Sequence, residues 1–444
     1  MADNPTDTTH INSQADSIRS EPVNAPTMAQ AFFVWLKIGL LSFGGPAAQI
    51  ALMHKIVVAE KNWLSEKQYL SALSFCMLLP GPEAMQLATF AGWKLHGVRG
   101  GIIAGLLFVI PGALVVFFFA AIYSLYGKVS LVESLFLGIK AAVIIVVIEA
   151  LLRVAKKALT NMEHWVIAAA AFVMIFFFNF PFPLIIASAA LYGFLRSKNH
   201  NTVSENIAAP AAGHVRATVT TIAIWLALWL LPFIFLWAVG AHDLLLRVGA
   251  FFSQLAVVTF GGAYAVLAYL AQDVVSQYGW LSAGEMMDGL GLAETTPGPL
   301  ILVTEFVAFL AGFKEGGFAL ATSAALITLW VTFVPCFLWI FAGAPYIDWL
   351  SDQPRLRGAM SAITAAVVGV ILNLSVWFAL HVLFRQVEPI KQGILTLWTP
   401  SLSSLDWRVA LLTVLCGIAA FVYHRSIGII LLMSALAALA LSVF

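Results

Sequence analysis

The chain has few charged residues. Lys and Arg number 23 and Asp and Glu number 22, so charged residues fill only 10% of the 444 positions, against about a quarter in a soluble domain. The formal net charge is +1, and the sequence holds no basic tract of the length that nucleic-acid binding requires. The composition therefore excludes a nucleic-acid partner and argues against a soluble domain.

Cysteine and catalytic motifs are also scarce. The three cysteines lie far apart in apolar sequence and form no metal-binding or disulfide pattern. We interpret them as small core residues. The sequence contains no Walker loop, nucleophile elbow or catalytic metal cluster. It therefore predicts a protein that is not an enzyme and that needs neither ATP nor another cofactor. The cysteines are Cys76, Cys336 and Cys416.

Apolar residues are abundant. They make up 61% of the chain, and the mean hydropathy is +0.94. Several uncharged stretches exceed the ~20 residues with which a helix spans a bilayer core. The alternation of a membrane barrel is absent, so we expect helical spans in a lipid bilayer. These stretches cover residues 100–127, 217–241, 248–272, 318–347 and 358–384.

Two signatures rich in glycine and proline occur twice. Every residue of the second copy lies 217 positions after its counterpart in the first, which indicates an internal duplication. In a membrane chain, apolar segments interrupted by Gly and Pro at corresponding positions of two halves point to a transport site. The first copy reads Phe43-Gly44-Gly45, Trp63-Leu64-Ser65 and Pro80-Gly81-Pro82, and the second reads Phe260-Gly261-Gly262, Trp280-Leu281-Ser282 and Pro297-Gly298-Pro299.

The duplication divides the chain into four parts. Each half ends in a pair of short apolar segments. Beyond the PGP motif the second half gains seven residues, because Pro111 aligns with Pro335 at an offset of 224. The predicted parts are a disordered polar tail that is not a signal peptide (1–28), a first transporter repeat (29–196), a polar connector with a linking transmembrane helix (197–243) and a second transporter repeat (244–444).

Loop charge predicts that the two repeats point in opposite directions. The loop 54–67 holds three lysines, whereas its equivalent 271–288 holds three acids and no Lys or Arg. Basic residues in short loops mark the cytoplasmic side. Equivalent loops are therefore expected on opposite sides, with the linking span 217–241 supplying the odd crossing. The fold class is an all-α polytopic membrane protein with two inverted-topology repeats and helix-breaking FGG and PGP motifs.

The number of full crossings stays open at this point. The loops 94–99, 153–157 and 196–216 are also basic. Placing all of them in the cytoplasm works best if segments 31–53 and 69–92 enter the membrane without crossing it. Ordinary spans are the alternative.

The glycine-proline breaks are the candidate substrate site. Pro-Gly-Pro interrupts the helical hydrogen-bond ladder, which is tolerated only inside protein or along a wet cavity. A half-helix starting at Pro82 or Pro299 would favour an anion at its N-terminus. The alternative is that PGP is only a loop and that the glycine pairs only allow tight helix packing. The candidates are Ser42, Gly44, Gly45, Pro46, Pro80, Gly81, Pro82, Thr259, Gly261, Gly262, Pro297, Gly298 and Pro299.

The polar residues differ between the halves. Intramembrane lysines are costly and tend to be functional, so Lys37 and Lys140 are further substrate-binding candidates, with snorkelling as the alternative. Thr295 and Thr296 precede the second PGP motif and are added to the set. Acidic residues beside an anion site make sense when their protonation is coupled to anion movement. The coupling candidates are Glu83, Glu294 and Glu305, and a helix-start carboxylate is the structural alternative for Glu83.

The motifs resemble the chromate ion transporter family, in its long-chain two-domain type, over residues 31 to 444. The matching positions are Lys37 to Pro46 (KIGLLSFGGP), Trp63-Leu64, Pro80 to Pro82, Thr259 to Gly262 and Pro297 to Pro299. Ala263 departs from the pattern, because it stands where the first half has Pro46. The short-chain members of this family occur as pairs of single halves with opposite orientation.

The resemblance implies a multi-pass inner-membrane protein that exports chromate, confers chromate resistance, and is driven by the proton gradient or the membrane potential. Chromate is a tetrahedral dianion shaped like sulfate, so a sulfate or other oxyanion permease is the alternative within the class. An anion channel or a non-transporting membrane scaffold is the alternative of another class. The sequence carries no signature of oligomeric state.

Overall fold

The computed structural model describes residues 26–126, 129–197, 212–260, 263–347, 353–393 and 395–442. Three sequence predictions fall partly or wholly outside these ranges: the disordered tail up to residue 25, most of the polar connector, and the pair Gly261-Gly262. Helix α1 begins at Met28, where the Thr27 side chain accepts a hydrogen bond from the amide of Gln30.

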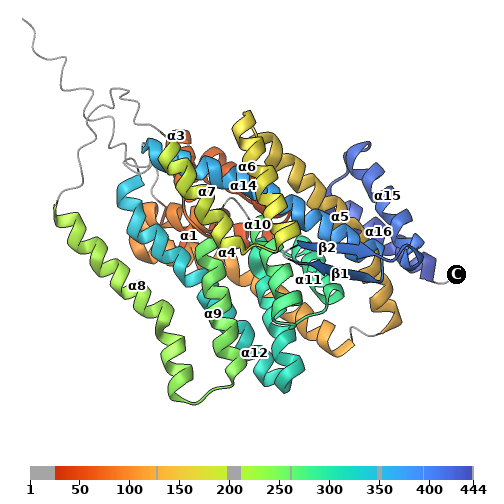
Figure 1. Cartoon of the computed structure of the whole chain (residues 1–444). Helices are drawn as coiled ribbons and strands as arrows, with labels where there is room; N and C mark the ends of the chain where they lie inside the picture. The colour runs from red at the N-terminus through yellow and green to blue at the C-terminus, as the bar shows by residue number, and fades with distance from the viewer. Residues whose placement is uncertain are drawn as a thin grey trace, which may run out of the picture.

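The described chain is helical apart from one β-hairpin, which confirms the predicted class of polytopic helical membrane protein (Figure 1). Within the described residues, five helices are long and apolar enough to cross a membrane. The first half contains α1 (Met28–Leu41), α2 (Gly45–Met53), the π-helix η2 (His54–Glu60), α3 (Glu66–Cys76), α4 (Glu83–Tyr126), α5 (Ser130–Ala158), α6 (Met162–Phe178) and α7 (Phe182–Arg196).

Helix α8 (Ala212–Ala238) links the halves and lies at one edge of the bundle (Figure 1). Most of its surface is exposed, as expected for a helix that faces lipid. The second half contains α9 (Asp243–Val258), α10 (Ala263–Gln272), η3 (Asp273–Gln277), α11 (Ala283–Thr295), η4 (Leu300–Leu302), α12 (Val303–Gly343), η5 (Ala344–Tyr346), α14 (Pro354–Leu383), β1 (Val387–Gln392), β2 (Leu395–Pro400), η6 (Leu402–Ser404), α15 (Trp407–Phe421) and α16 (Ile427–Ser442).

The first FGG motif and both PGP motifs lie in the described residues, and each interrupts the helices there. Gly44 and Gly45 have φ of 85° and 78°, which is left-handed backbone that side chains disfavour. Helix α1 therefore ends before them and α2 starts a new direction. The first PGP motif leaves residues 77–82 outside α-helix, and α4 begins directly after Pro82. In the second half, the short η4 begins directly after Pro299.

Helices α4 and α12 each fold back on themselves. Gly97 (φ 63°, ψ −156°) and Gly317 (φ 70°, ψ −162°) occupy backbone that is essentially accessible only to glycine. A Cβ on Gly92 would lie 2.4 Å from the carbonyl oxygen of Gly100, so the two arms of α4 pack tightly against each other. The first arm of α4 covers only residues 83–95, about 20 Å at ~1.5 Å per residue.

Backbone features recur along the two halves at increasing offsets. Non-helical positive φ occurs at Asn62 and Gly279, 217 residues apart, and at Asn179 and His424, 245 residues apart. The kinks at Gly97 and Gly317 are 220 apart. The offset reaches 224 at Pro111, so the final increase of 21 residues falls after α14, where the β1–β2 hairpin stands. The hairpin is therefore an insertion in the second half, and the sequence pattern did not predict it.

The terminal helices exchange partners between the halves. Helices α6 and α7 of the first half pack on α14 of the second, and α15 and α16 pack on α5 (Figure 1). The contacts are close, because a Cβ on Gly193 would lie 2.2 Å from the carbonyl oxygen of Gly358. In the other pair, the Ser434 hydroxyl donates to the carbonyl of Gly138 at 2.7 Å.

Candidate functional site

The helix breaks of the two halves meet through reciprocal hydrogen bonds. The amide of Gly81 donates to the carbonyl of Thr259 at 2.8 Å, and the amide of Gly298 donates to the carbonyl of Ser42 at 2.8 Å. Donors and acceptors are equivalent residues at the 217-residue offset. The side-chain amide of Gln49, which is buried, also donates to the Gly298 carbonyl at 2.7 Å. The predicted site residues around both breaks are thus brought together in one place.

The two hydroxyls at this junction are engaged within their own helices. Ser42 donates to the carbonyl of Ile38 and Thr259 to the carbonyl of Leu255, both at 2.6 Å. Both residues are fully buried. In this conformation neither these hydroxyls nor the amides of Gly81 and Gly298 are available to a ligand. Their predicted role as an anion cradle stays a prediction.

A cavity of about 680 Å³ lies on one side of the first break. Its wall includes Phe43 and Gly44, together with Glu294 and Thr295 from the end of α11. Glu294 is buried, and its Oε1 accepts a hydrogen bond from the Tyr264 hydroxyl at 3.0 Å. Its Oε2 has no hydrogen-bond partner within the described residues. The cavity therefore joins the break of one half to a coupling candidate of the other.

A second cavity, of about 460 Å³, adjoins the same break. Pro46, Glu83 and Tyr264 line it, together with a group of basic side chains and hydroxyls. On sequence grounds the basic loop 153–157 served only as a marker of membrane side, and its place in a cavity wall was not predicted. The basic and hydroxyl-bearing members are Arg153, Lys157, Thr160, His164, Ser361 and Thr364.

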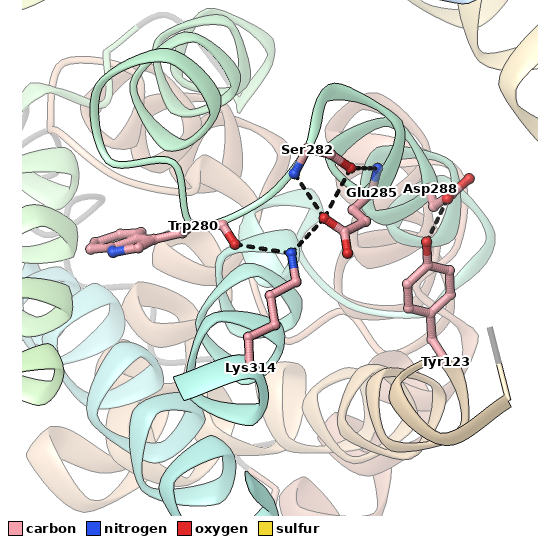
Figure 2. Close-up of polar contacts among 6 residues, drawn as sticks. All are labelled: Tyr123, Trp280, Ser282, Glu285, Asp288 and Lys314. Atoms are coloured by element: carbon pink, nitrogen blue, oxygen red, sulfur yellow. Dashed lines mark hydrogen bonds and ion pairs between the residues drawn. The ribbon is translucent and has the colours of Figure 1, made fainter. Parts of the chain in front are cut away.

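Lys140 does not face either cavity. Its ammonium lies 3.1 Å from Oδ1 of Asp288 in α11, and Oδ2 of Asp288 accepts a hydrogen bond from the Tyr123 hydroxyl at 2.6 Å. Figure 2 shows the Tyr123 hydroxyl directed at Asp288. The Asp288 side chain is 6% exposed and that of Lys140 22%. A partly buried inter-repeat ion pair therefore lies outside the two cavities, and its acidic member was not among the sequence candidates.

A second ion pair fixes the start of α11 close to Asp288. Ser282 and Glu285 form a capping box, and Oε2 of Glu285 lies 2.6 Å from the ammonium of Lys314 (Figure 2). Lys314 also donates to the carbonyl of Trp280 at 3.1 Å. Burial raises the pKa of Glu285, but the hydrogen bonds from Lys314 and Ser282 outweigh it and hold that pKa below its usual range. Ser65 and Gln68 form the equivalent capping box in the first half, which explains why the serine of the Trp-Leu-Ser motif is repeated.

Of the candidates Lys37, Glu305, Thr295 and Thr296, three lie apart from the two cavities. Lys37 is exposed on α1, and Glu305 is buried in α12 with its Oε2 unpartnered within the described residues. The hydroxyls of Thr295 and Thr296 donate to the carbonyls of Leu292 and Ala293. Of this group, Thr295 alone contributes to either of the two cavity walls described above.

Comparison with known proteins finds matches over both halves. The profile of a family described as "Chromate transporter" matches residues 29–194 and 246–441. The "Probable chromate transport protein" of Synechococcus elongatus is 30% identical over 349 residues, which cover 78% of this chain and 83% of that protein. The "Chromate transport protein" of Pseudomonas aeruginosa is 30% identical over 81% of this chain and 83% of its own. That of Cupriavidus metallidurans is 27% identical over 90% and 92%. No solved structure matches the chain.

Proposed function

This chain belongs to the chromate transporter family, and from that premise we propose that it is a secondary active transporter that exports chromate across the inner membrane and confers chromate resistance. The observation that carries the proposal is the family match over both halves, together with relatives named chromate transport proteins. The driving force is the proton gradient or the membrane potential.

Helix packing supports an inverted repeat. A Cβ on Gly101 would lie 2.6 Å from the ring of Phe341, and one on Gly105 would lie 2.7 Å from the ring of Phe337. Residue numbers at the contact therefore increase along α4 where they decrease along α12. The second arms of these two equivalent helices thus run antiparallel. Together with the opposite loop charges, this packing favours halves of opposite orientation. The short first arm of α4 favours a segment that enters the membrane without crossing it.

The difference between the halves supports alternating access. The basic cavity of the first half measures about 460 Å³. At the equivalent place of the second half, Trp377 and Trp398 line a space of about 10 Å³. Trp398 belongs to the inserted hairpin, and His381 packs between the two tryptophan rings. One half is thus open while its counterpart is filled by aromatic side chains, so the two halves differ in access to the break, as in one state of an alternating-access carrier.

Glu294 is the proposed coupling residue. A carboxylate and a dianion repel each other strongly where water is excluded. The oxyanion therefore enters the Glu294 cavity when Glu294 is protonated and leaves together with that proton. The proton then moves in the same direction as the oxyanion, so the membrane potential, which favours outward movement of the net negative charge, is the force that drives export. The unpartnered Oε2 and the Tyr264 hydrogen bond to Oε1 fit a group that holds and releases a proton there.

Transport into everted inner-membrane vesicles tests the proposal. The vesicles come from a host without its own chromate transporter, with and without expression of this chain, and labelled chromate is added with or without sulfate. We expect chromate to accumulate above its external concentration when an imposed proton gradient is directed into the lumen, with the more acidic side outside, and we expect an uncoupler to abolish that accumulation. In the Glu294→Gln variant, the imposed proton gradient should no longer drive accumulation. Flux that never exceeds equilibrium would indicate a channel, and no flux above the empty host would refute transport.

A further inference from the structure

The cavity between α5 and the first break is lined by cations on one wall. Arg153 and Lys157 lie one turn apart on α5 and face Pro46 and Glu83 across the space. Arg153 is bound to Glu149 at 2.6 Å, whereas Lys157 forms no ion pair within the described part of the chain. Lys157 lines the cavity together with Glu83, the first residue of α4. The cavity thus contains one cation that no carboxylate neutralises by direct contact.

The second half has lost this arrangement. At the offset of 224, Trp377 stands in place of Arg153 and His381 in place of Lys157. These aromatic side chains stack on each other with ring centres 4.2 Å apart. The cationic wall is therefore a property of one half and not a by-product of the duplicated scaffold.

The cavity is separated from the Glu294 cavity by two polar contacts. Tyr264 lines the basic cavity and donates to Glu294, which lines the other. Arg153 lines the basic cavity, and its partner Glu149 lines the other. An anion that reaches Lys157 would compete with Glu149 for Arg153. It would thereby weaken one of the two contacts that separate the cavities.

We propose that the basic cavity is a subsite for a tetrahedral oxyanion dianion, with Lys157 and Arg153 as its cationic ligands. In this proposal the oxyanion binds there, on the basic, cytoplasmic side, before it moves past the first break. Two cations in a partly enclosed cavity suit a doubly charged tetrahedral ion, since both can contact different oxygens. This assignment rests on the proposed function for its direction, but the binding itself is measured without transport.

The test compares Lys157→Gln with Lys156→Gln in the purified full-length protein. Lys156 is adjacent, equally charged and exposed, but it does not line the cavity, so it controls for net charge. Equilibrium dialysis with labelled chromate, and separately with labelled sulfate, gives the Kd, and reconstitution into liposomes gives the flux. Arg153→Gln is the second cavity variant. Size-exclusion profiles verify that each variant is folded.

We expect Lys157→Gln to weaken oxyanion binding at least tenfold, about 1.4 kcal/mol, and Lys156→Gln to change it less than twofold. Equal effects of both lysines, no effect of either, or no oxyanion binding by the wild type would overturn the subsite. Flux with unchanged affinity in Lys157→Gln would refute the subsite and leave the transport function standing. Binding that depends on Lys157 without any flux would refute transport and leave the subsite standing.

Discussion

Neutralising Lys140 separates two roles that this lysine could have. It was a substrate candidate on sequence grounds, yet it pairs with Asp288 at 3.1 Å between α5 and α11. Removing one member of a buried ion pair costs about 3–5 kcal/mol. Asp288 keeps the hydrogen bond from Tyr123, and Lys140 is partly exposed. We therefore expect Lys140→Met to lower the free energy of unfolding by about 2–3 kcal/mol, at or just below the lower end of that range.

The double variant Lys140→Met with Asp288→Asn is the informative one. Asparagine still accepts the Tyr123 hydrogen bond but carries no charge, so the uncompensated carboxylate disappears. We expect the double variant to regain stability to within about 1 kcal/mol of the wild type. Thermal unfolding of the purified protein in detergent measures the stability, and chromate uptake by liposomes measures function.

Stability and uptake together distinguish the two roles of Lys140. Recovery of both in the double variant assigns Lys140 to the inter-repeat contact. Recovery of stability without uptake assigns it to the transport cycle as well. The reasoning is refuted if Lys140→Met is as stable as the wild type, or if the double variant is no more stable than the single one, because the ion pair would then contribute no coupling energy.

Two further predictions concern the break and the topology. Gly45→Leu should abolish chromate uptake but leave membrane insertion intact, because leucine in left-handed backbone costs about 1–2 kcal/mol and its side chain would extend toward the Tyr264 hydroxyl, 3.8 Å from the Cβ position. The control, Gly240→Leu, replaces a left-handed glycine with open space around it and should keep uptake. Equal uptake by both variants would remove the break from the mechanism. Single cysteines at Val58 and Val275, in a background without native cysteines, should react with an impermeant reagent from opposite sides of the membrane; labelling from one side would rule out the inverted repeat.

The helix breaks could be predicted because glycine and proline act locally. Proline removes a backbone donor, and Gly44 and Gly81 adopt φ values that other residues avoid. The same holds for the repeat, since identical tripeptides at one offset need no knowledge of packing. The helical class and the short terminal helix pairs followed from hydropathy and length alone.

Contacts between the halves could not be predicted in this way. Lys140 and Asp288 meet only because α5 packs on α11, and hydropathy does not determine which helices become neighbours. The Ser42 hydroxyl could donate a hydrogen bond either to a ligand or to a carbonyl of its own helix. In the structure it donates to the i−4 carbonyl of Ile38. The sequence pattern for the β1–β2 hairpin is weak, because it consists only of Gly393 between two short segments of alternating residues. The strong helical patterns on both sides of it dominated the prediction.

The exchanged helix pairs have a consequence for biosynthesis. Helices α6 and α7 can pack on α14 only after α14 has been synthesised. That helix begins at Pro354, 158 residues after Arg196 (354 − 196). At about 5–20 residues per second, the ribosome needs roughly 8–30 s to supply that partner. During this interval the face of α7 that carries Gly193 lacks its partner α14. A second nascent copy that arrives first with its α14 would produce a domain-swapped dimer, so the speed of translation through the linker helps to determine whether one chain closes on itself.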